Sequence, residues 1–76
     1  MSIKKDLARE ITMLQKEMSA LESKRSRSMA ALVEDLIYKR EPSVTEMQFF
    51  RQYSAEIELK REKLVELTAQ LKKLLS

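Results

Sequence analysis

The sequence contains no cysteine, histidine or glycine, and only one proline, Pro42. Without cysteine there is no disulfide, and without cysteine and histidine the thiolate and imidazole ligands of metal sites are missing. The same two absences remove the usual nucleophile and proton carrier of enzymes. Glu58 and Glu62 share a helix face by their spacing, but no base or ligand set accompanies them. We therefore expect a protein that is not an enzyme and binds no cofactor or metal.

Long apolar stretches are also missing. No run approaches the roughly 20 residues that a membrane-spanning helix needs, and residues 1–14 lack the apolar block of a signal peptide. We expect a cytoplasmic protein that does not enter a membrane. The formal charge of +3, with acidic residues spread among the basic ones, permits a nucleic acid or an acidic partner without requiring either.

What the sequence does contain favours long helices. Charged residues make up 36% and apolar residues 43% of a chain of 76 residues, a composition typical of helices with charged surfaces. A chain of this length forms at most one small domain, and a single core of this size contributes little net stability. The expected organisation is one helical hairpin domain over residues 1–76, with a partner that completes its core.

The turn is predicted at Glu41-Pro42-Ser43. Pro42 disfavours the helical conformation at Glu41 and lacks an amide hydrogen, so the first helix should end before it. Ser43 and Glu46 have the spacing of a capping box, which indicates that a second helix begins at once. We predict an all-α fold in which helices over about 3–40 and 43–75 pack as an antiparallel two-helix coiled coil, with Ser2 as the first N-cap.

The heptad pattern supports this hairpin. Apolar residues recur with alternating spacings of four and three in both predicted helices, which is the a and d pattern of a coiled coil. The members of this pattern are Leu7, Ile11, Leu14, Met18, Leu21 and Leu32 in the first helix, and Phe50, Tyr53, Ile57, Leu64, Leu67, Leu71 and Leu74 in the second. Arg25 and Ser28 interrupt the first helix and Lys60 interrupts the second.

Folding the chain back about Pro42 predicts a register. It places Ile11 level with Leu74, Leu32 level with Tyr53, and Arg25 in one layer with Lys60.

Two basic residues in one layer cost stability unless acidic residues lie beside them. Ion pairs of Glu22 with Arg61 and of Glu56 with Lys24 would supply those acids.

Two interpretations of this polar layer remain open. It is either a solvated waist that fixes the register, or part of a basic belt that binds an acidic surface or a phosphate backbone. The belt would consist of Lys24, Arg25, Arg27, Lys60, Arg61 and Lys63.

Near the turn the apolar residues outnumber the positions that two helices can cover. We assign Leu32, Leu36, Phe50 and Tyr53 to the core between the helices. The surplus predicts either self-association into a four-helix bundle or binding to another helical protein. The predicted partner-binding residues are Met29, Val33, Ile37, Met47 and Phe49. The pattern leaves open whether the partner is a second copy, and in which orientation two hairpins would pack.

The basic amphipathic first helix, the Pro-Ser turn and the segment from Thr45 to Tyr53 that opens a leucine-rich return helix resemble small helical-hairpin components of bacterial type III secretion and flagellar export. The chain is similar to the stalk protein of the export ATPase and to the small co-chaperones of needle subunits. This chain is shorter than the stalk proteins and lacks the small-residue pattern of the co-chaperones. The resemblance implies a secretion-apparatus protein as partner and implies no particular site residue.

The leading hypothesis is a non-enzymatic protein–protein interaction module, a small coiled-coil adaptor, chaperone or secretion component that acts by helix packing. The alternative is a dimeric four-helix bundle that binds nucleic acid through the basic belt. Binding to a membrane surface is the weaker third possibility, because the apolar stripe is already used between the helices.

Overall fold

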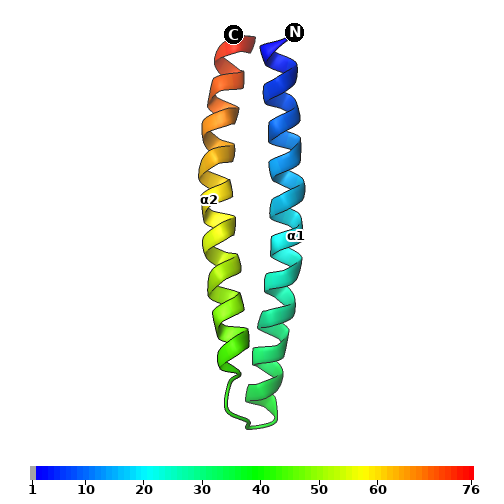
Figure 1. Cartoon of the computed structure of the whole chain (residues 1–76), viewed down its shortest axis with the longest axis vertical. Helices are drawn as coiled ribbons and strands as arrows, with labels where there is room; N and C mark the ends of the chain where they lie inside the picture. The colour runs from blue at the N-terminus through cyan, green and yellow to red at the C-terminus, as the bar shows by residue number, and fades with distance from the viewer. Residues whose placement is uncertain (1) are drawn as a thin grey trace.

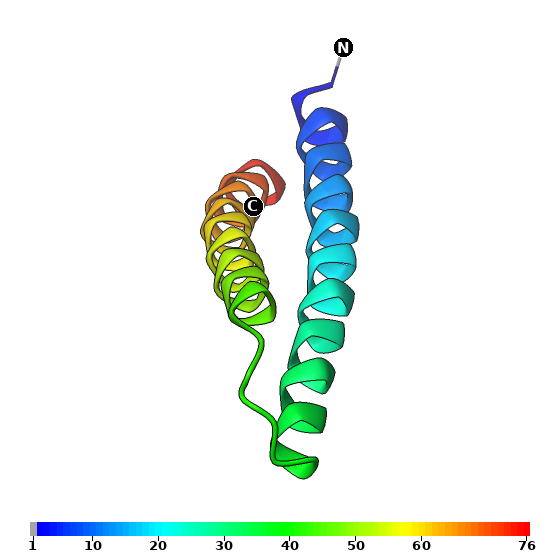
Figure 2. The same ribbon diagram turned by 60° about the horizontal axis from the view of Figure 1, so that its bottom comes forward.

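The computed structural model describes residues 2–76, which form two long helices, α1 (Ile3–Ile37) and α2 (Val44–Leu75). The helices lie side by side and antiparallel, so both chain ends lie at one end of the molecule (Figure 1). The hairpin measures 56 × 17 × 15 Å. This confirms the predicted all-α antiparallel hairpin. Figure 2 shows the connecting loop and shows that the two helix axes are inclined to one another, as in a coiled coil.

Helix α1 begins where the sequence predicts but ends earlier than expected. The Lys5 amide donates to Ser2 Oγ at 3.4 Å, so Ser2 is the N-cap. The helix ends at Ile37, three residues before the predicted end at about residue 40. The Lys39 amide donates to the Leu36 carbonyl and the Arg40 amide to the Asp35 carbonyl, which is a Schellman motif. Lys39 takes the left-handed conformation, with φ 54°, that this motif requires. The helix therefore stops through its own C-cap, before Pro42 acts.

Helix α2 begins through half of the predicted capping box. The Glu46 amide donates to Ser43 Oγ at 3.2 Å, as expected. The Ser43 amide does not use the Glu46 carboxylate. It donates instead to Asp35 Oδ2 at 3.1 Å, so a side chain from the last turn of α1 caps the start of α2. Asp35 thereby links the end of α1 to the start of α2 across the loop.

The core is a narrow stripe between the helices. Five apolar side chains are buried among residues 2–76, namely Leu7, Met18, Leu21, Ile57 and Leu67. Met18, Leu21 and Ile57 form the central cluster, with Tyr53 and Leu64 packed against it. Ile57 is only 1% exposed, and Ser28 is the one polar side chain of this part of the chain that is buried. All of these residues occupy a or d positions, which confirms the predicted stripe except at its end, where Leu74 is 40% exposed.

The predicted register, in contrast, is wrong by about one heptad. Lys60 was expected level with Arg25, but its Nζ lies 2.7 Å from Glu17 Oε2, eight positions earlier in α1. Asp35 was expected opposite Phe50, but it bonds to Ser43, seven positions earlier in α2. Leu7 is buried, although the expected register gives it no residue of α2 to face. A shift of one heptad keeps every a position opposite a d position, so periodicity alone does not distinguish the two registers.

The observed register has a physical advantage. It places Arg25 level with Tyr53 and Lys60 level with Met18, so the two basic residues lie in separate layers, about 10 Å apart along the axis. Each then faces an apolar residue along which its aliphatic stem can lie, while its charge reaches solvent or an acid. Both side chains are half-buried, and the Lys60 ammonium is paired with Glu17. Separating two like charges is favoured over stacking them in one layer.

Candidate functional site

The candidate site is the apolar surface at the turn end of the hairpin, on one side of the helix pair. Met29, Val33 and Leu36 follow one another along α1 at spacings of four and three residues and are exposed. Met29 lines a shallow groove with Arg25, Ser26 and Phe50 of the facing helix. Met47, three residues before Phe50, lies one turn nearer the loop on the same side of α2. We call Met29, Val33, Leu36, Met47 and Phe50 the turn-end apolar face.

The predicted partner-binding residues divide between two sides of the hairpin. Met29 and Val33 are exposed and Met47 is half-buried, and all three belong to the turn-end apolar face. Ile37 is exposed one turn beyond Val33, at the edge of this face. Phe49 lies on the opposite side, where it lines a groove with Lys24, Arg27, Ser28, Glu46 and Tyr53. The structure therefore brings four of the five predicted residues to one end and one side, and separates Phe49 from them.

Leu36 corrects an expectation drawn from the sequence. We assigned it to the core between the helices, but its side chain is 67% exposed. The other three residues that we assigned to the core are half-buried, namely Leu32, Phe50 and Tyr53. At this height α1 has passed the start of α2, so no residue of α2 remains to cover Leu36. The predicted position of the loop already indicated that Leu36 would be exposed, because the last turn of a helix before a loop has no facing helix to cover it.

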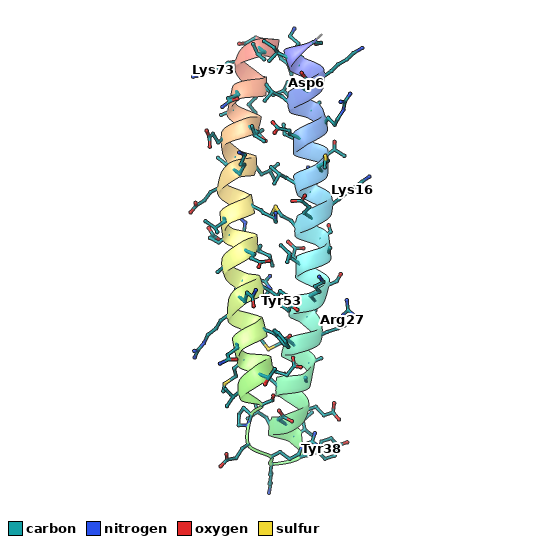
Figure 3. All side chains as sticks on the ribbon, in the orientation of Figure 1. Asp6, Lys16, Arg27, Tyr38, Tyr53 and Lys73 are labelled. Carbon is teal, nitrogen blue, oxygen red and sulfur yellow. The ribbon has the colours of Figure 1, made fainter. Side chains whose placement is uncertain are left out.

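On the other side of the hairpin, aromatic and basic side chains lie together. The rings of Phe49 and Tyr53 stack with centroids 6.0 Å apart. Lys24 and Arg27 from α1 line the same groove, together with the carboxylate-bearing Glu46. Tyr53 and Arg27 are labelled at nearly the same height on neighbouring helices in Figure 3.

The six residues of the predicted basic belt do not form one continuous surface. Lys24 and Arg27 line the groove beside Phe49, whereas Arg25 lines the groove on the other side with Met29. Because of the register, the three belt residues of α2 lie farther from the turn, toward the end of the hairpin where the chain termini lie. These residues are Lys60, Arg61 and Lys63. Lys60 is paired with Glu17 and Arg61 with Glu58, while Lys63 is exposed.

The two ion pairs expected across the helices are absent from residues 2–76. Arg61 Nη1 lies 2.9 Å from Glu58 Oε2 on its own helix, so it does not reach Glu22. Glu56 accepts a hydrogen bond from Gln52 Nε2 at 3.4 Å in place of an ion pair with Lys24. Exposed pairs of this kind contribute about 0–1 kcal/mol each, so this exchange changes stability little.

The described residues also bear on other kinds of site. In the part of the chain that the structure covers, no three acidic residues converge as metal ligands do. Neither helix has a stretch that is both long and apolar enough to cross a bilayer.

No protein-family model matches the chain, and no curated protein or solved structure matches it significantly.

Proposed function

We propose that this protein is a non-enzymatic interaction module that binds a helical protein through its turn-end apolar face. The observation that carries the proposal is the exposure of Met29, Val33 and Leu36 in one row beside a core that contains few fully buried residues. Aliphatic side chains in such a row are the usual anchors of a helix that packs into another helix pair. The function is then that of a small coiled-coil adaptor, chaperone or secretion-apparatus component in the cytoplasm.

The binding mechanism would be completion of a helical bundle. Two helices cover only one stripe of each other, and a partner helix laid along α1 and α2 would cover a second stripe. Phe50 already lies half inside the hairpin, so the partner would extend an existing core and would not create a separate one. Burial of aliphatic side chains drives such binding, and salt changes its strength little.

Capture experiments with single substitutions test this proposal. We expect the tagged chain to retain a protein partner from an extract of its own cells, and Val33→Glu to abolish retention. Phe49→Ala lies on the other side of the hairpin and serves as the matched control, which should retain the partner. Equal retention by the wild type and Val33→Glu would contradict the proposal.

Nucleic-acid binding is the second candidate, and the groove beside Phe49 is the observation that favours it. Stacked aromatic rings next to Lys24 and Arg27 are the elements with which proteins hold single-stranded bases and phosphates. Glu46 in the same groove opposes a phosphate backbone, which is why we rank this function second. It predicts binding that weakens steeply with salt and with neutralisation of Lys24 and Arg27, the two basic residues of this groove, to Gln.

A further inference from the structure

We propose that Met29 is an oxidation site through which peroxide controls the turn-end apolar face. Conversion of its thioether to a sulfoxide makes this face polar and releases a bound protein, while the hairpin itself stays folded. The inference rests on the proposed function and adds its regulation. It is carried by the sulfur content of the chain, by the exposure of each methionine and by the sides of the hairpin on which they lie.

Methionine is the only sulfur-containing residue type of this chain, because cysteine is absent. A thioether is oxidised where an oxidant can reach it. Met13 is 55% exposed and Met29 is 42% exposed, whereas Met18 is 9% exposed and belongs to the core cluster. Met47 is half-buried, and Met1 lies outside the described residues. A small oxidant should therefore react with Met13 and Met29 well before it reaches Met18.

The two exposed methionines lie on different sides of the hairpin. Met29 occupies an e position of the heptad and lines the groove with Phe50 on the turn-end apolar face. Met13 occupies a c position, which belongs to the side that carries Phe49. It also lies earlier in α1, roughly 24 Å farther from the turn than Met29. Oxidation of Met13 therefore leaves the turn-end apolar face unchanged, and Met13 serves as a control within the same chain.

Met47 extends the sulfur-bearing part of this face to α2. It also occupies an e position, and the e positions of two antiparallel helices lie beside one another. In the observed register the heights of Met29 and Met47 differ by only about 3 Å along the axis. Two flexible thioethers thus lie within the face, where a partner helix would bury them.

Hydrogen peroxide is the only co-reactant that the modification needs. A lone pair of the Met29 sulfur attacks one peroxide oxygen, the O–O bond breaks, an S–O bond forms and water leaves. The sulfur loses two electrons, which reduce the peroxide. A dithiol reverses the step through a methionine sulfoxide reductase, and it becomes a disulfide as water is released. Because the chain has no cysteine, neither reagent finds a thiol or a disulfide of the protein to react with.

The sulfoxide opposes binding and leaves folding intact. Met29 is exposed in the free hairpin, so water hydrates the new oxygen. A partner helix would bury this oxygen among the aliphatic and aromatic side chains of the face, which offer no hydrogen-bond donor. Burying a polar atom without a hydrogen bond weakens binding by roughly tenfold or more. At Met18 the same oxygen would enter the core and destabilise the hairpin.

Partial oxidation of the tagged wild-type chain with hydrogen peroxide tests the proposal. Peptide mass mapping should find sulfoxide at Met13 and Met29 before Met18, and circular dichroism should stay unchanged. The oxidised chain is then incubated with the cell extract, and gel filtration separates bound chain from free chain. We expect Met29 sulfoxide to be depleted roughly tenfold from the bound fraction and Met13 sulfoxide to be distributed equally. Methionine sulfoxide reductase with dithiothreitol should restore binding.

Glutamine substitutions provide a second test that needs no peroxide. Met29→Gln places a permanent polar group of similar length on the face, so it should lower retention of the partner. Met13→Gln is the matched control, since it changes the exposed methionine on the other side of the hairpin. It should retain the partner as the wild type does.

Three results would overturn the proposal: oxidation of Met18 ahead of Met29, loss of helicity as Met29 reacts, or equal amounts of Met29 sulfoxide in the bound and free fractions. The last of these would leave the proposed function intact, because the chain still binds its partner. A wild-type chain that retains no protein before oxidation would remove the proposed function, and the regulation with it.

Discussion

Lys39 carries the conformational strain of the turn. Its φ of 54° lies in the left-handed region, which suits glycine and disfavours residues with a Cβ atom. The position is the C′ residue of the Schellman motif, where glycine is the most common choice. A chain without any glycine must therefore place another residue there, at an energetic cost.

Lys39→Gly should increase the free energy of unfolding by about 0.5–1 kcal/mol, because glycine takes the left-handed conformation without a steric penalty. The measurement is urea unfolding followed by circular dichroism. Lys63→Gly is the control: Lys63 is exposed within α2, and glycine there should cost about 1 kcal/mol. A destabilised Lys39→Gly variant would mean that the Lys39 side chain makes a stabilising contact at the turn.

At the scale of the elements, Asp35 decides how the helices are joined. Its carboxylate accepts the Ser43 amide at 3.1 Å with one oxygen and lies 3.4 Å from Arg40 Nε with the other. The Arg40 guanidinium in turn lies 5.2 Å from the centre of the Tyr38 ring. Helix end, loop and helix start are thus connected through one side chain.

Asp35→Ala should destabilise the hairpin by about 1–2 kcal/mol, because the amide of Ser43, the N-cap of α2, loses its acceptor. Asp35→Asn retains a carbonyl oxygen for Ser43 and loses only the charge toward Arg40, so it should cost less. Glu34→Ala is the control, since Glu34 also pairs with Arg40 but touches no amide of α2. Thermal unfolding monitored at the helical band provides the comparison, and equal costs for Asp35→Ala and Glu34→Ala would contradict the role of the hydrogen bond.

The sequence predicts the two helices, their caps at Ser2 and Ser43, and the stripe of a and d residues. It does not predict the register, because a heptad repeat defines the pairing only to within seven residues. The like charges of Arg25 and Lys60 in the expected layer were the available sign that another register is better. The bond from Ser43 to Asp35 was harder to foresee, since the capping box supplied a nearer acceptor in Glu46. The division of the apolar surplus into two sides does not depend on the register, because a shift of one heptad leaves each residue on the same side of the stripe. Met29 and Met47 fall at e positions and Phe49 at a g position, which already places Phe49 on the other side.

At the scale of the whole molecule, we expect Arg25 and Lys60 to disfavour the competing register. In the observed hairpin each of them faces an apolar residue, and in the register shifted by one heptad they would face each other. Buried or half-buried polar residues often lower stability while they specify one arrangement of a coiled coil. The two basic residues would then be retained in the heptad stripe for specificity and not for stability.

Replacing both residues by leucine tests this role directly. The variant Arg25→Leu with Lys60→Leu should unfold at a higher temperature than the wild type, because two half-buried charges become core contacts. It should also populate both registers, since the like-charge layer no longer disfavours the shifted one. Disulfide trapping can measure the populations in a chain that has no cysteine of its own. Leu14→Cys with Leu64→Cys should close in the observed register, and Leu14→Cys with Leu71→Cys only in the shifted one. We expect the wild-type background to form the first bridge alone and the double-leucine background to form both. If the double-leucine background also formed only the first bridge, the loop and the Asp35 cap would be sufficient to fix the register without the two charges.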